Sequence, residues 1–302
     1  MKYKLSVAVS VGIGIGIWVL VLLRTDTETT TITLPQLFIK NPSSECDAII
    51  GGLKDKVEAG IGLDITSGEI FWEKSSDKPC KIASLTKLMV VLLAMERIRE
   101  GEHKLSDIVS VTSESAHMGG SQVYLKEGET FQLQELLKSM MIISANDASY
   151  LVAQYLGGTA PDFVRQMNNK ASSMGLKDTY FSNPTGLPPD KEESHNVSSC
   201  MDIAKLAIEV IKYPEVMQWA GRDCDFIRGG EFKLKNWNRL LRSCDFVDGL
   251  KTGYYREAGY NIVATSINGK KKVIAIVLGA KTCRIRDKVA KALVDYGLHK
   301  SS

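Results

Sequence analysis

A serine and a lysine three positions apart, Ser84 and Lys87, form the pair in this 302-residue sequence best suited to nucleophilic chemistry. An apolar run, Leu88 to Val91, follows them, so we expect a helix from Ser84 that ends at Glu100-Gly101. Such a helix places both side chains on one face, one turn apart. Ser84 would then lie where free N–H groups favour negative charge, and a neutral lysine could serve as its base. Taken alone, the pair is more often a helix cap and a solvated lysine.

Two further short patterns favour a catalytic pair over a helix cap and a solvated lysine. Ser144-Ala145-Asn146 falls at the junction of two predicted helices, and Lys251-Thr252-Gly253 falls at the end of a predicted strand. Each pattern is common by itself, as a cap or a strand end. However, Ser144 stands 60 positions after Ser84, and Lys251 stands 107 positions after Ser144. The three patterns therefore occur in the order found in penicillin-binding proteins and class A β-lactamases.

The predicted elements that would position these residues form an α/β domain. We expect strands near 48–50, 59–65 and 70–72, and again at 225–235, 247–250, 259–267 and 271–278, with a hairpin turn at Asn268-Gly269. Apolar periodicity predicts helices at 133–143, 146–156, 160–174, 199–212 and 284–296. Strands from both ends of the chain would pair in one antiparallel sheet, flanked by helices, with an all-helical subdomain between them. A cleft between the sheet and this subdomain is the natural place for a site.

The composition argues against several other classes. The chain is 44% hydrophobic and 24% charged, as in ordinary globular proteins. Its net charge of +3 is too small to indicate a nucleic-acid partner. The six cysteines contain no Cys-x-x-Cys pair, which argues against a zinc site and leaves their pairing open. We therefore expect neither a metal nor a cofactor.

The first 24 residues predict a membrane anchor or a signal sequence. Lys2 and Lys4 precede an apolar run over residues 5–23, close to the ~20 residues that a spanning helix needs. The run ends without a small-x-small cleavage site, which favours an uncleaved anchor over a signal peptide. The positive-inside rule then places everything after residue 24 outside the cytoplasm. We interpret the threonine-rich residues 25–45 as a tether and residues 46–300 as the catalytic domain.

From residue 46 onward, the chain resembles the low-molecular-mass penicillin-binding proteins, the serine D-alanyl-D-alanine carboxypeptidases. The resemblance implies the β-lactamase/transpeptidase-like fold. It also implies an enzyme on the extracytoplasmic side of a bacterial membrane that removes the terminal D-alanine from peptidoglycan stem peptides and is inhibited by β-lactams. The segments that carry it are Ile82–Met89, Met141–Ala148, Phe181–Leu187, Val247–Gly253, Glu257–Tyr260 and Leu278–Ala280.

The resemblance also implies a role for each candidate residue. Ser84 would attack the penultimate D-alanine carbonyl, and Lys87 would take its proton, with a pKa lowered by burial and by nearby Lys251. Ser144 would relay a proton to the leaving nitrogen. The other expected roles are binding roles. Asn146 would hold the peptide amide or contact Lys87, whereas Lys251 and Thr252 would bind the substrate carboxylate and Gly253 would let the substrate approach closely. The N–H groups of Ser84 and Tyr254 would bind the oxyanion. Arg286, with Arg284 as a rival, would bind the terminal carboxylate.

Three alternatives remain open at this point. A D,D-endopeptidase would use the same site on peptidoglycan cross-links, and short relatives without a further β-rich domain include such enzymes. A class A β-lactamase would need a Glu-x-x-Leu-Asn segment between Ser144 and Lys251, and the sequence has none there. A non-catalytic sensor would have no need of complete active-site motifs. His195 is expected to be a structural histidine.

Overall fold

The computed structural model describes residues 7–8, 20–21, 38–188, 194–267 and 271–300. It divides into one unit over residues 1–33 and a second over residues 34–302. In the first unit, β1 (Val7–Ala8) pairs antiparallel with β2 (Leu20–Val21). The rest of the anchor predicted at 1–24, and the tether up to residue 37, lie outside the described residues. Within the described ranges, no helix is both long enough and apolar enough to cross a bilayer.

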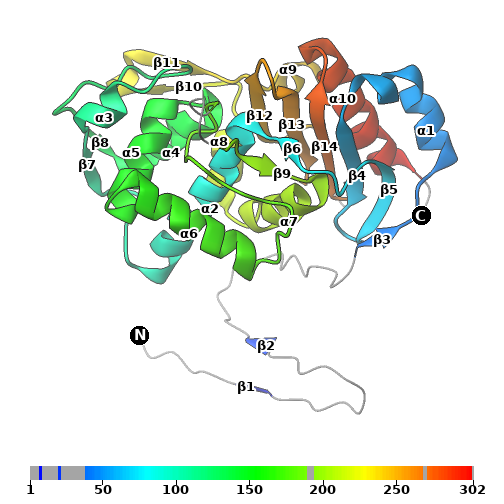
Figure 1. The fold of residues 1–302 in the computed structure, drawn as a ribbon, viewed down its shortest axis with the longest axis horizontal. Helices are drawn as coiled ribbons and strands as arrows, with labels where there is room; N and C mark the ends of the chain where they lie inside the picture. Colours follow the sequence, from blue (N-terminus) through cyan, green and yellow to red (C-terminus); the bar gives the residue numbers. More distant parts are fainter. Residues whose placement is uncertain (1–6, 9–19, 22–37, 189–193, 268–270, 301–302) are drawn as a thin grey trace. The chain divides into compact units, whose positions relative to one another are not determined.

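A six-stranded sheet is the framework of the second unit (Figure 1), with the strand order β12-β13-β14-β4-β5-β3. Strands from both ends of the chain meet where β4 pairs antiparallel with β14, as predicted. The sheet is antiparallel throughout its longer strands, whereas the short β3 runs parallel to β5. The strands are β3 (Ile39–Lys40), β4 (Ala59–Asp64), β5 (Glu69–Lys74), β12 (Gly249–Tyr255), β13 (Gly259–Ser266) and β14 (Val273–Ala280).

Helices cover both faces of this sheet. In Figure 1, α1 (Ser44–Ile50) and α10 (Cys283–His299) lie on one side, and α7 (Cys200–Val210) lies on the other. A core cluster that includes Phe71, Val277 and Leu293, all fully buried, joins the sheet to α10. This burial of apolar side chains fixes the start of α10 beside the sheet.

The remaining helices form the block predicted between the two groups of strands. Its central helix is α2 (Lys87–Glu100), in which every residue from Lys87 to Met95 is buried, as expected for a helix inside the core. The other α-helices are α3 (Ser113–Ala116), α4 (Leu133–Ile142), α5 (Asn146–Gly157), α6 (Ala160–Ser173), α8 (Pro214–Ala220) and α9 (Leu240–Ser243). Short 3₁₀ helices are η1 (Gly51–Lys56), η2 (Ala83–Thr86) and η3 (Arg228–Gly230). Three small strand pairs are β6 (Cys80–Lys81) with β9 (Val197–Ser198), β7 (Ile108–Ser110) with β8 (Thr130–Gln132), and β10 (Cys224–Ile227) with β11 (Phe232–Lys235).

The strand predicted at 48–50 is wrong, because these residues end helix α1. The hydroxyl of Ser43 caps this helix by accepting from the N–H of Cys46. Cys46 and Ile50, four positions apart, are buried in the core cluster. A short apolar run fits a strand or one face of a helix equally well, and here the cap decides between them.

Other boundaries also differ from prediction. The strand expected at 247–250 is β12, which runs from 249 to 255, so Lys251, Thr252 and Gly253 lie in the middle of an edge strand instead of at its end. The helix expected to stop at Pro214 is followed by another, α8, with this proline in its first turn. Proline fits that position because the first turn of a helix needs no N–H donor. The turn expected at Asn268-Gly269 lies outside the described residues.

Candidate active site

Ser84 lies in the 3₁₀ turn η2, directly before α2, which begins at Lys87. The predicted helix start at Ser84 is therefore three residues early. The turn forces Ala83 to a positive φ of 49°, a conformation that is uncommon away from glycine and that often marks active sites. Gly186 packs against this turn so closely that a Cβ there would lie 2.2 Å from the carbonyl oxygen of Ala83. The position of Ser84 is thus fixed by backbone packing on its neighbours.

Lys87 is fully buried, and its side-chain nitrogen contacts the serine directly. Its Nζ donates to Ser84 Oγ at 3.1 Å and to Asn146 Oδ1 at 2.7 Å, and it also donates to the carbonyl oxygen of Thr185. Burial holds the pKa of Lys87 well below its usual value, and the nearby charge of Lys251 lowers it further. A lysine in this state is a suitable base for a serine.

Ser144 and Lys251 form a second pair beside the first. Lys251 Nζ donates to Ser144 Oγ at 2.9 Å and to the carbonyl oxygen of Thr252 at 3.1 Å. Burial, together with the charge of Arg286, lowers the pKa of Lys251 to about 7. Ser144 has a positive φ of 65° at the junction of α4 and α5. At neutral pH this pair can therefore both hold and release a proton.

The edge strand β12 lies against the turn that carries Ser84. A Cβ on Gly253 would be 2.8 Å from the carbonyl oxygen of Ile82 and 3.0 Å from the nitrogen of Ser84. The nucleophile turn therefore approaches Gly253 closely, and the approach of the substrate to this glycine stays a prediction. Tyr254, next along the strand, is 55% exposed, and its ring stacks on Tyr260 at 4.2 Å between centroids.

These elements enclose one cavity of about 760 Å³. It brings together the predicted residues Ser84, Ser144, Thr252, Gly253, Tyr254 and Arg286. Lys87 and Asn146 bond to each other behind Ser84. Of the two arginines in the first turn of α10, Arg286 lines the cavity and is 3% exposed. Arg284 is exposed and is not among the lining residues.

Several lining residues escaped the sequence analysis. The segment before β12 adds Lys235, Asn236, Trp237, Arg239 and Arg242 to the wall, and Ser121 and Cys283 also line it. These residues match no spacing rule, so their place could come only from the fold. The Thr185 acceptor is a backbone carbonyl, which residue type cannot signal. His195 is hydrogen-bonded through Nδ1 to the hydroxyl of Tyr255 at 2.7 Å.

The cysteines and the acidic groups add no further centre. All six cysteines fall within the described ranges, and each is a free thiol there. In the same ranges, no group of three or more His, Cys, Asp or Glu side chains is arranged to hold a metal ion.

Comparison with known proteins identifies the family. The sequence model of the D-alanyl-D-alanine carboxypeptidases matches residues 54–282. The chain belongs to the D-alanyl-D-alanine carboxypeptidase family. The match confirms the resemblance seen in the sequence, and the family is one of serine peptidases.

Individual relatives support the family assignment and the fold. The D-alanyl-D-alanine carboxypeptidase DacF of Bacillus subtilis is 38% identical over 247 residues, which cover 81% of this chain and 62% of DacF. A D-alanyl-D-alanine endopeptidase of Haemophilus influenzae is 31% identical over 207 residues, or 67% of this chain and 68% of that protein. The ampicillin-bound structure of a Listeria monocytogenes penicillin-binding protein is 32% identical, with a TM-score of 0.73, covering 80% of this chain and 98% of that one. The predicted transpeptidase-like fold is confirmed.

The chain spans less than two thirds of the length of three carboxypeptidase relatives that it matches, 60–63% in each case. The match to the family model, residues 54–282 of this chain, includes Ser84, Ser144 and Lys251.

Proposed function

We propose that this protein is a serine D-alanyl-D-alanine carboxypeptidase, which removes the terminal D-alanine from peptidoglycan stem peptides through an acyl-enzyme on Ser84. The observation that carries the proposal is the contact between Ser84 Oγ and the fully buried Lys87 Nζ at 3.1 Å. Because burial and the nearby charge of Lys251 hold the pKa of Lys87 well below its usual value, this amine loses its proton more readily than a solvated lysine and can accept the serine proton.

In the proposed reaction, Ser84 Oγ attacks the carbonyl carbon of the penultimate D-alanine, and the proton of its hydroxyl passes to Lys87 Nζ. The N–H groups of Ser84 and Tyr254 would stabilise the oxyanion that forms. When the C–N bond breaks, Ser144 donates its proton to the leaving nitrogen and takes one from Lys251, which lies 2.9 Å away. Water then adds its hydroxyl to the ester carbonyl carbon and gives its other proton through Ser144 to Lys251. As the ester bond breaks, Lys87 returns its proton to Ser84 Oγ, and the stem peptide leaves one residue shorter.

The binding roles follow from positions in the cavity. Thr252 and Arg286 both line it, and their hydroxyl and guanidinium groups would hold the terminal carboxylate of the leaving D-alanine. Asn146 is fixed by Lys87 at 2.7 Å and by the carbonyl oxygen of Gly119 at 2.8 Å, so its main role would be to orient the base. We also propose that β-lactams acylate Ser84, as supported by the ampicillin-bound relative.

Cleavage of cross-links by the same site is the second candidate, favoured by the similarity to the Haemophilus influenzae endopeptidase. The experiment that separates the two offers the purified protein a stem pentapeptide and a cross-linked dimer in parallel, with Ser84→Ala as the blank. Release of free D-alanine from the pentapeptide at the higher kcat/KM supports the carboxypeptidase. Cleavage of the dimer alone would establish the endopeptidase instead.

We further propose that the protein acts outside the cytoplasm and is attached to the membrane by residues 1–24. The support is the apolar run over residues 5–23 after two lysines in the sequence. Deleting residues 1–24 behind a cleavable export signal should move the protein from the membrane fraction to the soluble extracytoplasmic fraction. Recovery of both forms in the same fraction would refute the attachment.

A further inference from the structure

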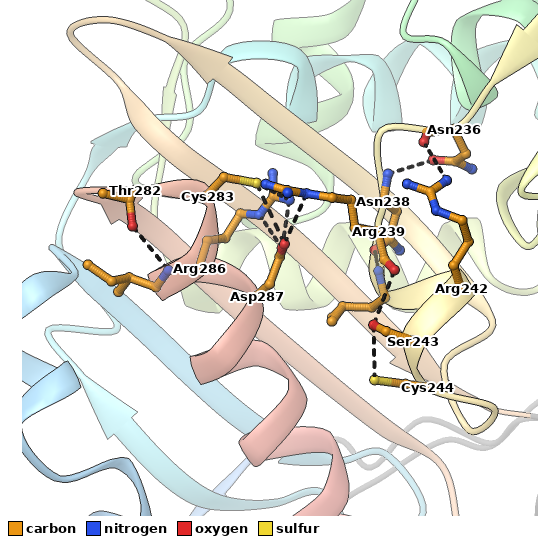
Figure 2. A network of polar contacts seen from close by, with 12 residues as sticks. Asn236, Asn238, Arg239, Arg242, Ser243, Cys244, Thr282, Cys283, Arg286 and Asp287 are labelled. Carbon is orange, nitrogen blue, oxygen red and sulfur yellow. Dashed lines mark hydrogen bonds and ion pairs between the residues drawn. The ribbon is translucent and has the colours of Figure 1, made fainter.

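Two guanidinium groups from distant parts of the chain meet at the wall of the active-site cavity (Figure 2). Arg286 belongs to the first turn of α10, and Arg239 directly precedes α9. Arg286 Nε and Nη2 donate to Asp287 Oδ1 at 2.9 and 2.6 Å. Arg239 Nε lies 3.5 Å from the other oxygen, Asp287 Oδ2. One carboxylate therefore holds both arginines.

The thiol of Cys283 joins this cluster from the other side. Arg286 Nη2 also donates to Cys283 Sγ at 3.2 Å, and Arg239 interacts with the same thiol. Figure 2 shows the two guanidinium groups converging between Cys283 and Asp287. The sulfur of Cys283 accepts from Arg286 and so helps to hold this guanidinium group beside that of Arg239.

The charges of this cluster do not balance. In the part of the chain that the structure describes, the ion pairs of Arg286 and Arg239 both go to Asp287, so two positive charges share one negative charge. Arg242, which lines the same cavity, has its own partner in Asp223. The side chain of Arg286 is 4% exposed, whereas that of Arg239 is 56% exposed. A partly compensated, buried positive charge is costly, and an anion from the cavity would relieve that cost.

We propose that Arg239 is a second ligand for the free carboxylate of the leaving amino acid and so determines the preference for substrates that end in a carboxylate. The inference rests on the proposed function, because it assigns the carboxylate to that reaction's substrate. Arg239 and Arg286 line one cavity with Ser84 and Thr252. Guanidinium groups bind carboxylates through paired N–H donors. Asp287 is the positioning residue that holds the two guanidinium groups at one place.

The test compares two peptides that differ only at the end, one closing in D-Ala-D-Ala and the other in D-Ala-D-alaninamide. Release of D-alanine or D-alaninamide is measured for the wild type and for Arg239→Gln. We expect Arg239→Gln to lower kcat/KM on the acid by about tenfold or more, since a charge-assisted hydrogen bond is lost. The same variant should change kcat/KM on the amide by less than about twofold. Arg242→Gln is the matched control, and it should keep the wild-type ratio of acid to amide.

An unchanged acid-to-amide ratio in folded Arg239→Gln would overturn the inference, as would an equal loss of ratio in Arg242→Gln. Circular dichroism and thermal melting establish folding. If Arg239→Gln does not fold, Arg239→Lys replaces it, because lysine keeps the charge and loses the paired donors; its acid-to-amide ratio should fall, and an unchanged ratio would likewise overturn the inference. Failure of the proposed function is distinct from this outcome, since the wild type itself would then release no D-alanine.

Discussion

Replacing Asn146 by aspartate tests whether the protonation state of Lys87 controls acylation. In the wild type, Asn146 Oδ1 accepts from Lys87 Nζ at 2.7 Å, so the substitution puts a carboxylate where a neutral amide now stands. A negative charge at that distance favours the protonated form of Lys87 and raises its pKa. The lysine then holds its proton at a pH where the wild-type lysine is already a free base, and acylation slows.

The size of the effect follows from the geometry. Two unit charges about 4 Å apart interact by about 4 kcal/mol at an effective dielectric constant of about 20. The contact here is closer, but the cost of burying the new carboxylate offsets part of the gain. Since about 1.4 kcal/mol corresponds to a factor of ten, we expect the ratio of protonated to neutral Lys87 to rise between about a hundredfold and a thousandfold. On the acid limb of the pH profile, acylation should fall by the same factor.

The assay is the rate of acylation by benzylpenicillin, measured from pH 5 to pH 11. Asn146→Asp should shift the acid limb to higher pH and recover toward the wild-type rate above it. Asn146→Ala is the matched control, because it removes the same acceptor and adds no charge. Its acylation should be slower throughout, with no shift of the acid limb to higher pH. If the two variants gave the same pH profile, Lys87 would not be the base.

Three further predictions concern the surroundings of the site. Arg286→Gln should raise the pKa of Lys251 from about 7, because a neighbouring positive charge is removed; an NMR titration of the lysine side chains would show it, and an unmoved midpoint would contradict it. Gly253→Ala should lower the free energy of unfolding by about 1–3 kcal/mol, and with it Tm and the acylation rate, since the new Cβ would lie 2.8 Å from a backbone carbonyl oxygen. Gly52→Ala, with open space around it, is the control and should change neither Tm nor the acylation rate. Thr282→Ala should lower the free energy of unfolding by about 1 kcal/mol, because the cap of α10 is lost; equal thermal melts would rule that cap out as a contributor.

The sequence was enough to predict which residues supply the chemistry of the site, but not how they are arranged in space. Ser84, Lys87, Ser144 and Lys251 could be selected because side-chain type and order along the chain together restrict the possible reactions. The hairpin of β4 and β5 and the helices of the central block also follow from periodicity, since each has a clear apolar pattern bounded by turn residues. These features depend on local sequence, which is why they could be predicted.

What escaped prediction depends on packing between distant segments. Arg239 reaches the cavity only because α9 and the start of α10 meet there, although the two residues that bind Asp287 are far apart in sequence. The expected helix start at Ser84 is a 3₁₀ turn, and Gly186 and Gly253, both distant in sequence, pack closely against its backbone. The strand predicted at 48–50 is the end of helix α1, because a short apolar run carries no period of its own.

The central claim is that Ser84 is the nucleophile and Lys87 its base. The most direct measurement is intact-protein and peptide mass spectrometry after incubation with benzylpenicillin, for the wild type and for Ser84→Ala. The account predicts one covalent adduct, mapped to the peptide that contains Ser84, and none on the variant. An adduct of the same yield on Ser84→Ala, or one that maps to Ser144 in the wild type, would contradict it.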